Sequence, residues 1–417
     1  MVNSNIYNED ELNPPNWINE EFFKRILDKT ESESVKINTL LLSPGTLKND
    51  HYSSVLFRAK LNYALCSKPK EEKSLSFIMK TEPNVDGIKK DKMKQVPLFE
   101  TEIRMYTKVL PKIEAELRAI GDKTVLSPKL FHYSLQSPQC VVFEDLVADG
   151  YSTINNRRGT LDEVKLALLK LAKIHAITFK FAREGDQVVN SFHNHFINTV
   201  DIPNFPVLRD GIKLTKEIVR DAPDLQEYLP HIEAAEKFLI PKALDVLNAY
   251  TNGKRSGIQV LNHGDVHVKN VMVKNGDSKL RELLLLDYQL SIFGSAAIDL
   301  HYVFVMFYSP DMRRDHMDEL LYYYITNFQD TLRRVQYPGH IPTITEFRAE
   351  LQEHRHWGLF LLFTLLIFNY GFVDDSIEVY KLVESDAERR AYYTKSKIVN
   401  ELRVLLPRFL HLGYFEQ

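Results

Sequence analysis

The most informative segment of the chain reads HGDVHVKN, from His263 to Asn270. Two short apolar runs follow it, and the turn signal Asn275-Gly276-Asp277 separates them. The runs are Val271 to Lys274 and Glu282 to Leu286. Two strand-like runs joined by such a turn predict an antiparallel hairpin. Because a hairpin brings the start of its first strand beside the end of its second, we expect Asn270 and Asp287 to be spatial neighbours.

Three polar side chains therefore meet at one end of the predicted hairpin. The amide oxygen of Asn270 and the carboxylate of Asp287 suit a hard cation such as Mg²⁺, which prefers oxygen ligands. Asp265 precedes Asn270 in the same loop and can accept a proton from an attacking hydroxyl. This set of groups is what phosphoryl transfer needs. The alternative is that Asp265 and Asn270 cap the loop and that Asp287 forms a turn.

The first part of the chain reads as strands with one good helix, and the remainder reads as helices. Strand-like patterns cover Val55 to Ala64, Leu75 to Lys80 and Gln139 to Phe143. Further on, Thr160-Leu161-Asp162-Glu163 is a capping box that opens a long amphipathic helix. We therefore expect an α+β fold with two lobes. The expected boundaries are 1–145, a strand-rich lobe with an N-terminal helical extension, and 146–417, a mostly helical lobe.

Lys80 and Glu102 are expected to pair in the strand-rich lobe. Lys80 ends a strand, and Glu102 lies within the apolar stripe of the helix that starts near Pro97. A carboxylate on a buried face is costly unless it is paired. A Lys–Glu pair of this kind positions the lysine on nucleotide phosphates. The alternative is that Glu102 reaches solvent and Lys80 is an ordinary charge at the end of a strand.

Composition excludes several classes of function. The 417 residues carry 53 basic and 56 acidic side chains, so the formal net charge of −3 gives no basic excess for nucleic acid or a membrane surface. Met1 to Pro15 has no apolar run of the secretory type, and Trp357 to Val373 is too short for a membrane span and reads as a buried core helix. We expect a cytoplasmic protein that binds neither nucleic acid nor membrane, and no protein partner is implied.

The two cysteines are expected to form no disulfide framework, and the paired histidines are expected to form no metal site. Cys66 and Cys140 lie in apolar, strand-like surroundings and are expected to be buried free thiols. The two histidine pairs lack further ligands at metal-binding spacing and are expected to lie at the surface. These pairs are in His193-Asn194-His195 and His354-Arg355-His356.

Taken together, these motifs resemble small-molecule phosphotransferases of the kinase-like type, including choline kinases and aminoglycoside phosphotransferases. More closely, the chain resembles the ecdysteroid kinase-like family of insects, from about residue 14 to the end. The matching segments are Pro15 to Ile18 with Phe22, Phe99 to Pro111, Val142 to Leu146, Leu171 to Ala176, Asn262 to Asp265, and Asp299-Leu300.

The resemblance implies a protein-kinase-like bilobal fold that uses ATP and Mg²⁺. It implies that Asp265 is the catalytic base, that Asn270 and Asp287 bind the metal, and that His263 and Asp299 brace the loop; His263 as the base is the alternative. For the nucleotide it implies the following groups: Lys80 with Glu102 on the phosphates, backbone atoms of Glu144 and Leu146 on adenine, and Ser53 and Ser54 in a phosphate loop.

Some positions depart from the family pattern. Asn49 stands where the phosphate loop of the family usually has a glycine. Asparagine tolerates positive φ better than most residues, so the loop can still form. His267 and Lys269 stand where the family commonly has tryptophan and asparagine, which leaves substrate specificity open.

The resulting expectation is an O-kinase that moves the ATP γ-phosphoryl group to a small-molecule alcohol. The resemblance suggests an ecdysteroid, or another lipophilic alcohol of plant or xenobiotic origin. The alternatives are a choline or ethanolamine kinase and a catalytically silent pseudokinase that only binds a ligand. Aromatic side chains of the helical lobe are candidates for an acceptor pocket, with core packing as the alternative for each. They are Tyr302, Phe304, Phe307, Tyr308 and Trp357.

Overall fold

The computed structural model describes residues 11–46, 54–83, 96–154, 157–254, 256–276, 280–374 and 376–417. The chain forms two compact units. The first consists of Met1–Tyr106 and Ser127–Ser152, and the second of Thr107–Leu126 and Thr153–Gln417.

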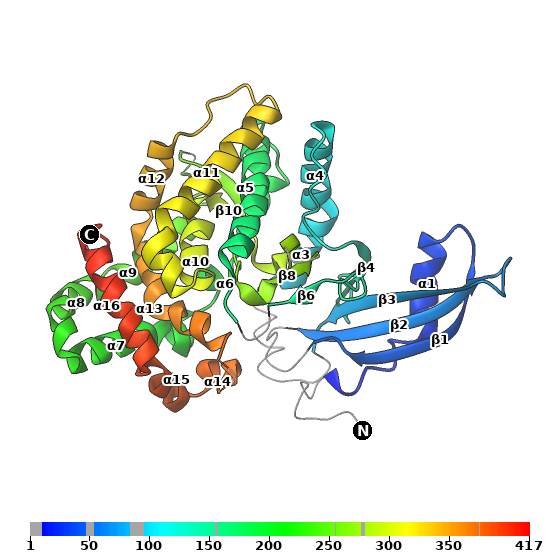
Figure 1. Cartoon of the computed structure of the whole chain (residues 1–417), viewed down its shortest axis with the longest axis horizontal. Helices are drawn as coiled ribbons and strands as arrows, with labels where there is room; N and C mark the ends of the chain where they lie inside the picture. The colour runs from blue at the N-terminus through cyan, green and yellow to red at the C-terminus, as the bar shows by residue number, and fades with distance from the viewer. Residues whose placement is uncertain are drawn as a thin grey trace. The chain divides into compact units, whose positions relative to one another are not determined.

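The first unit is built on a five-stranded antiparallel sheet with the strand order β1-β2-β3-β5-β4 (Figure 1). The strands are β1 (Val35–Pro44), β2 (Val55–Leu65), β3 (Glu72–Thr81), β4 (Leu130–Ser134) and β5 (Cys140–Glu144). The three strands predicted from the sequence are confirmed as β2, β3 and β5. Strands β1 and β4, which lie at the two edges of the sheet, were not predicted from the sequence.

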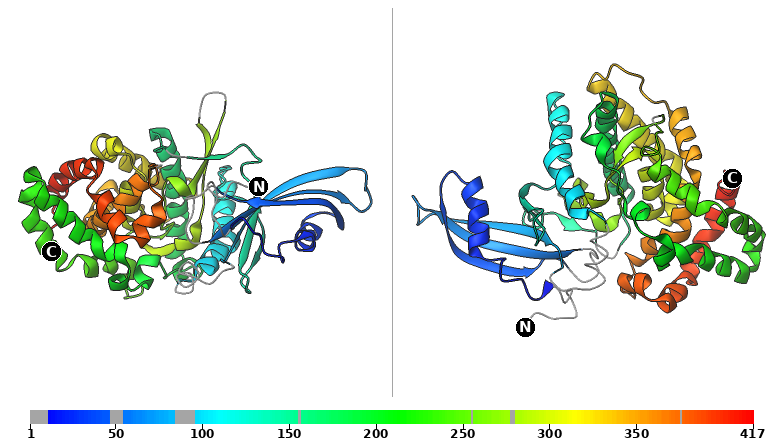
Figure 2. Two further views of the ribbon diagram at one scale, coloured as in Figure 1. Left: turned by 90° about the horizontal axis from the view of Figure 1, so that it is seen from below. Right: turned by 180° about the vertical axis from the view of Figure 1, so that it is seen from behind.

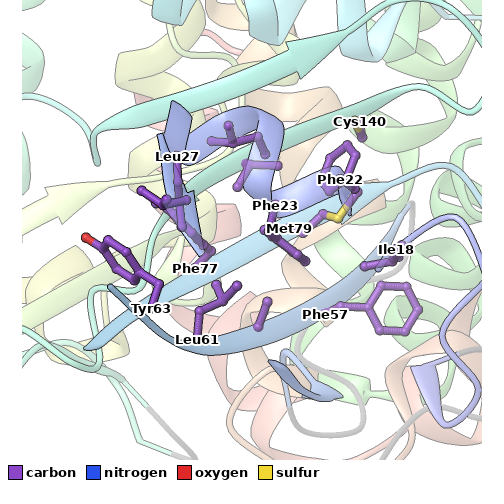
Figure 3. Packing of buried hydrophobic residues seen from close by; sticks show 14 of the residues in the cluster. Ile18, Phe22, Phe23, Leu27, Phe57, Leu61, Tyr63, Phe77, Met79 and Cys140 are labelled. Atoms are coloured by element: carbon purple, nitrogen blue, oxygen red, sulfur yellow. The ribbon is translucent and has the colours of Figure 1, made fainter. Parts of the chain in front are cut away.

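Helix α1 (Glu20–Thr30) covers one face of this sheet, and its start is capped by the side chain of Asn19. Its apolar side chains pack on those of β2 and β3, as Figure 3 shows, and the rings of Phe23 and Phe77 stack at 5.7 Å. Side chains alternate along a strand. Phe77 and Met79 therefore belong to this core, whereas Lys80 projects from the opposite face.

A helical segment follows the first three strands along the chain. It begins as α3 (Leu98–Arg104), continues through a π-helical turn (Met105–Val109) and ends as α4 (Leu110–Ala119). The boundary between the two units falls within the π-helical turn, after Tyr106. The predicted helix near Pro97 is confirmed, and Glu102 is buried as expected, with 2% of its surface exposed.

The second unit is mostly helical, and its longest helix is α5 (Leu161–Arg183). The predicted capping box is confirmed, because Thr160 and Glu163 exchange side-chain-to-backbone hydrogen bonds at the start of α5. Helix α5 packs along α11, with α4 on its other side (Figure 2). The other helices of eight or more residues are α7 (Pro206–Asp221), α8 (Leu229–Glu236), α9 (Leu239–Asn248), α10 (Ala297–Met306), α11 (Met317–Arg334), α12 (Ile344–Glu353), α13 (Arg355–Gly371), α15 (Asp386–Tyr393) and α16 (Ser396–His411). The shorter α6 (Phe196–Thr199) and α14 (Val379–Glu384) complete the α-helices of the described part of this unit.

Two antiparallel strand pairs interrupt the helices of the second unit. Strands β7 (Gln259–Asn262) and β10 (Ile292–Ser295) form one pair. Strands β8 (Val271–Asn275) and β9 (Leu280–Leu285) form the other, in a register that places Val271 opposite Leu285. The hairpin predicted from the sequence is therefore confirmed.

Helix α13 confirms the predicted core helix, because most of its side chains, including Trp357, are buried. It packs against α10. Among the residues that the structure describes, no helix combines the length and the apolar character that crossing a bilayer requires.

Two expectations about cysteine and histidine burial are wrong in part. Cys140 is buried within β5, but Cys66 is exposed because it lies in the turn that follows β2. His195, His354 and His356 are buried rather than at the surface. For His356 the reason is a 2.7 Å contact between its Nε2 and the backbone oxygen of Glu416.

Candidate active site

The candidate site of the second unit consists of two loops that connect the strand pairs. The loop from His263 to Asn270 leads from β7 to β8, and a second loop leads from β9 to β10. The N–H of Leu286 donates to the backbone oxygen of Asn270 at 2.9 Å. This bond places Asp287 directly beyond the residue paired to Asn270, as the hairpin argument predicts.

The carboxylate of Asp265 is held by polar groups of its own loop and of α10. Its Oδ2 accepts from Asn270 Nδ2 at 2.9 Å, and its Oδ1 accepts from the hydroxyl of Tyr302 at 2.5 Å. His267 Nε2 lies 3.2 Å from the same Oδ1. Burial alone would raise the pKa of Asp265, but the neighbouring His267 and the Tyr302 hydroxyl outweigh it and hold that pKa below its usual range. The carboxylate is therefore ionised at neutral pH.

His263 holds the loop through both of its ring nitrogens. The N–H of Asp265 donates to His263 Nδ1 at 3.3 Å, so the ring proton lies on Nε2, which donates to the backbone oxygen of Leu286 at 2.9 Å. Burial lowers the pKa of His263, which favours the neutral ring. These contacts fit the predicted bracing role and leave His263 poorly placed to act as a base.

Asp299 fixes the backbone of the same loop from the first turn of α10. Its carboxylate accepts from the N–H of His263 at 2.6 Å and from the N–H of Gly264 at 2.8 Å. It also accepts from His175 Nε2 at 3.1 Å, and the hydroxyl of Tyr324 donates to the other ring nitrogen of His175. Burial would raise the pKa of Asp299, but the hydrogen bond from His175 outweighs it, so the net shift is downward.

Gly264 is required at its position for two reasons. Its φ is +83°, in the left-handed region that glycine adopts readily, and a Cβ there would lie 2.2 Å from the backbone oxygen of Leu290. His195 Nε2 lies 3.2 Å from the carbonyl oxygen of Gly264, while its Nδ1 accepts from the N–H of Ile197. The buried His195 is thus a support of the loop, which the sequence analysis did not foresee.

Asp287 adopts an unusual backbone conformation for a residue other than glycine. Its φ of 63° and ψ of 58° lie in the left-handed region, and Gln289 Nε2 donates to its Oδ2 at 3.1 Å. Conformations of this kind are costly and cluster at functional sites. The backbone therefore supports a specific placement of this carboxylate beside Asn270.

The donor set of Asn270 and Asp287 fits Mg²⁺. Asn270 uses its amide nitrogen on Asp265, so its Oδ1 is the atom that can meet a cation, and Asp287 contributes a carboxylate. Hard oxygen donors of this kind, few in number and completed by water and phosphate, are typical of Mg²⁺. Within the described ranges no cluster of three or more His, Cys, Asp or Glu side chains forms a metal cage.

In the first unit, the predicted pair of Lys80 and Glu102 is confirmed as an ion pair. Lys80 Nζ lies 2.8 Å from Glu102 Oε2, and the two side chains are 8% and 2% exposed. Lys80 projects from β3 and Glu102 from α3. Separating such a buried pair would leave an uncompensated charge, at a cost of about 3–5 kcal/mol. The pair therefore fixes the direction of the lysine.

The backbone around the end of β5 leaves two groups in position for a ligand. The N–H of Glu144 already donates to Lys129, whose own N–H donates to the side chain of Glu144 at 2.7 Å. The carbonyl of Leu146 accepts from Tyr151 at 3.0 Å. A contact of these two residues with adenine would thus use the carbonyl of Glu144 and the N–H of Leu146.

The structure describes only one of the two serines of the predicted phosphate loop, Ser54. Ser54 is buried, with 1% of its surface exposed, and directly precedes β2. Ser53 and Asn49 lie outside the described residues.

A family model described as the ecdysteroid kinase-like family matches residues 48–337, more than half of the chain. The chain belongs to this family. The membership confirms the family and the kinase-like fold class predicted from the sequence, and the α+β architecture of the two units agrees with both. Ecdysteroid kinase-like proteins are kinase-like phosphotransferases, and a small-molecule kinase is the class of activity that follows.

Solved structures of low sequence identity are also similar to this chain. Plasmodium vivax ethanolamine kinase is 12% identical, with 95% of this chain and 91% of that chain covered and a TM-score of 0.42. Choline kinase from Cryptosporidium parvum Iowa II is 12% identical, with coverage of 94% and 100% and a TM-score of 0.40. A GDP complex of a mutant aminoglycoside 2'-phosphotransferase is 11% identical, with coverage of 95% and 99% and a TM-score of 0.35. A comparison with curated protein sequences gave no significant match.

The five aromatic candidates for an acceptor pocket of this ecdysteroid kinase-like protein are all buried. Tyr302 contacts Asp265, and Trp357 donates its indole N–H to the backbone oxygen of Ile298 at 3.1 Å. Phe304 and Tyr308 line a small apolar pocket, together with side chains from α11, α12 and α16. Core packing therefore accounts for most of this set, and Tyr302 belongs with the loop that carries Asp265.

Sequence reasoning missed the polar supports of the loop: His175, His195, Tyr302 and Tyr324. Only Tyr302 carried a usable signal. It follows Asp299 by three positions on one helix, and residues three apart share a helix face. An aspartate bound to the loop therefore predicts that the side chain three residues later also reaches it.

Proposed function

We propose that this chain is an ATP- and Mg²⁺-dependent O-kinase. It transfers the γ-phosphoryl group to a hydroxyl of an ecdysteroid or a similar lipophilic alcohol, including plant-derived and xenobiotic ones, and it acts in the cytoplasm. The observation that carries the proposal is the convergence of Asp265, Asn270 and Asp287 in two adjoining loops. In this proposal residues 1–145 bind the nucleotide, and residues 146–417 carry the catalytic loop and bind the acceptor.

The nucleotide would be bound by side chains and backbone groups of the first unit. Lys80, directed by Glu102, would bind the ATP phosphates. The carbonyl of Glu144 and the N–H of Leu146 would hydrogen-bond adenine. Ser53 and Ser54 would contribute to the phosphate loop, as the resemblance implies.

The second unit would supply the base and the metal ligands. Asp265 would take the proton of the acceptor hydroxyl as its oxygen forms a bond to the γ-phosphorus. The bond from that phosphorus to the β–γ bridging oxygen breaks, and ADP leaves. Asn270 and Asp287 would hold Mg²⁺, which when bound neutralises charge on the phosphates. Because three donors hold the Asp265 carboxylate, it can meet the acceptor hydroxyl without a change of orientation.

The test measures transfer of labelled γ-phosphate from ATP to a panel of ecdysteroids, plant alcohols, choline and ethanolamine. We expect transfer to a lipophilic alcohol that stops when Mg²⁺ is chelated. Asp265→Asn should lower kcat by at least ~10²-fold, the lower end of the usual effect of a general base. Asp318→Asn is the matched control, because Asp318 is 76% exposed on α11.

Nucleotide binding, measured in parallel with a fluorescent ATP analogue, separates the alternatives. If phosphate is transferred only to choline or ethanolamine, the substrate class is a cationic alcohol and the proposal of a lipophilic acceptor is wrong. Binding of Mg²⁺-ATP with no transfer to any acceptor would favour a ligand-binding pseudokinase. Absence of both binding and transfer would contradict the kinase proposal itself.

A further inference from the structure

The two oxygens of the Asp265 carboxylate differ in the number of hydrogen bonds that they accept. Oδ1 has two donors, the hydroxyl of Tyr302 at 2.5 Å and Nε2 of His267 at 3.2 Å. Oδ2 has one donor among the described residues, Nδ2 of Asn270 at 2.9 Å. The Nδ1 atom of His267 accepts from the N–H of Lys269 at 3.2 Å, so the ring proton lies on Nε2 and points to Oδ1.

Each carboxylate oxygen has two lone pairs. Oδ1 is therefore fully engaged, and Oδ2 keeps one lone pair for a further donor. We propose that Oδ2 of Asp265 is the atom that receives the proton of the acceptor hydroxyl, and that Tyr302 and His267 are the positioning residues that select it. This inference rests on the kinase proposed above. In the step, the acceptor O–H bond breaks and an Oδ2–H bond forms. The acceptor oxygen bonds to the γ-phosphorus as the bond from that phosphorus to the β–γ bridging oxygen breaks and ADP leaves.

The arrangement of α10 explains why Tyr302 can hold this geometry. Asp299 and Tyr302 are three residues apart on α10 and share one face of it. Asp299 binds the backbone N–H groups of His263 and Gly264, and Tyr302 binds the side chain of Asp265. One helix turn thus fixes both the loop backbone and the rotation of the carboxylate about its terminal bond. Without the Tyr302 hydroxyl, the carboxylate can rotate away from the orientation that leaves the oxygen beside Asn270 open to a further donor.

His267 gives the second contact to Oδ1 and is itself packed. Its side chain is 7% exposed, and its ring lies 4.6 Å from that of Phe372. The contact with Asp265 needs only a donor at the Nε2 position. A glutamine side chain can supply that donor, and a leucine side chain cannot. Comparing His267→Gln with His267→Leu therefore separates the effect of the hydrogen bond from the effect of packing.

The first experiment compares kcat and the two KM values of four variants on the acceptor found by the panel. Tyr302→Phe and His267→Leu should lower kcat roughly 10–100-fold, the usual effect of removing a group that orients an active-site ligand, with the KM for ATP unchanged. His267→Gln should recover most of the loss. Tyr393→Phe is the matched control, because its buried hydroxyl donates to the backbone oxygen of Phe363 instead. An unchanged kcat in Tyr302→Phe, or equal losses in both His267 variants, would overturn the proposal.

A second experiment tests the contact without any acceptor. The unfolding equilibrium constant is measured for Tyr302→Phe in the wild-type chain and in an Asp265→Ala chain. We expect Tyr302→Phe to raise the unfolding equilibrium constant by a factor at least five times larger in the chain with Asp265 than in the Asp265→Ala chain. Equal effects in both backgrounds would refute the contact even if the kinase is active. Absence of transfer by the wild type would refute the kinase and its proton step, while this cycle still decides whether Tyr302 binds Asp265.

Discussion

Replacing Asp299 by asparagine tests whether the loop from His263 to Asn270 depends on the buried charge that binds its backbone. The carboxylate accepts from the N–H groups of His263 and Gly264 and from His175, and none of its surface is exposed. The substituted side chain would keep nearly the same shape and lose the charge and one acceptor atom. The variant therefore isolates electrostatics and hydrogen bonding from packing.

The expected loss follows from counting these bonds. If the oxygen of the asparagine keeps the bonds to His263 and His175, its amide group faces the N–H of Gly264. One charge-assisted bond of about 1.5–3 kcal/mol is then lost. The two remaining bonds become neutral and about half as strong. These losses add up to roughly 3–6 kcal/mol, and we expect Asp299→Asn to lower the free energy of unfolding by about 3–5 kcal/mol.

The assay is denaturant unfolding of the second unit, followed by the fluorescence of the buried Trp357 in a Trp17→Phe background. At about 2 °C per kcal/mol for a unit of this size, Tm should fall by roughly 6–10 °C. The control is Asp318→Asn, where the side chain is 76% exposed and a change within about ±0.5 kcal/mol is expected. A loss below about 1 kcal/mol for Asp299→Asn would refute the reasoning.

Three further predictions concern stability elsewhere in the chain. Gly264→Ala should destabilise the second unit by more than ~2 kcal/mol, because the added Cβ would clash with the backbone. Gly185 has a similar positive φ but open space around it, so Gly185→Ala should cost only about 1–2 kcal/mol. Thermal unfolding of the two variants tests this difference. Phe23→Ala should lower the free energy of unfolding by about 3–5 kcal/mol, because the ring is fully buried, and a urea titration that finds less than ~1 kcal/mol contradicts this. Burial would raise the pKa of Asp122, but Lys173 outweighs it and lowers that pKa to about 2. The ion pair therefore stabilises the fold above about pH 4, and this stabilisation is lost as the pH falls toward 2. Asp122→Asn should lower the free energy of unfolding by about 1–2 kcal/mol at pH 7. In acid titrations this difference between the variant and the wild type should shrink between about pH 4 and pH 2.

Two contacts of the candidate site could be predicted because each depends on a pattern within a short segment of the chain. The placement of Asn270 beside Asp287 follows from two strand-like runs and a turn, and the structure pairs the two strands in that register. The pairing of Lys80 with Glu102 follows from the rule that a carboxylate on an apolar face needs a partner, and the two side chains meet at 2.8 Å. In each case the pattern of the neighbouring sequence left very few residues that could be the contact partner.

Contacts between distant segments left no comparable pattern. His175 is 124 positions from Asp299, and its place in an apolar helix face looks the same whether it packs or binds a carboxylate. His195 also gave no sign of its contact with Gly264. Cys66 was expected to be buried because its neighbours are apolar, yet it lies just beyond the end of β2, where the chain turns out of the sheet. Strand ends and distant partners are set by tertiary packing, which one sequence does not display.

The motif from His263 to Asn270 is therefore only part of what makes this site. Asp265 is held by Tyr302, His267 and Asn270, and the loop backbone is held by Asp299 and His195. Buried polar groups must all be satisfied, because an unpaired one costs about 1–3 kcal/mol. Removing any one support therefore weakens the geometry of the loop, although most of these supports would not touch a substrate. A chain that kept the motif and lost Tyr302 or Asp299 would then retain the proposed catalytic residues and lose contacts that align them. In this family, the side chains at those two positions should therefore separate active kinases from silent relatives better than the motif itself does.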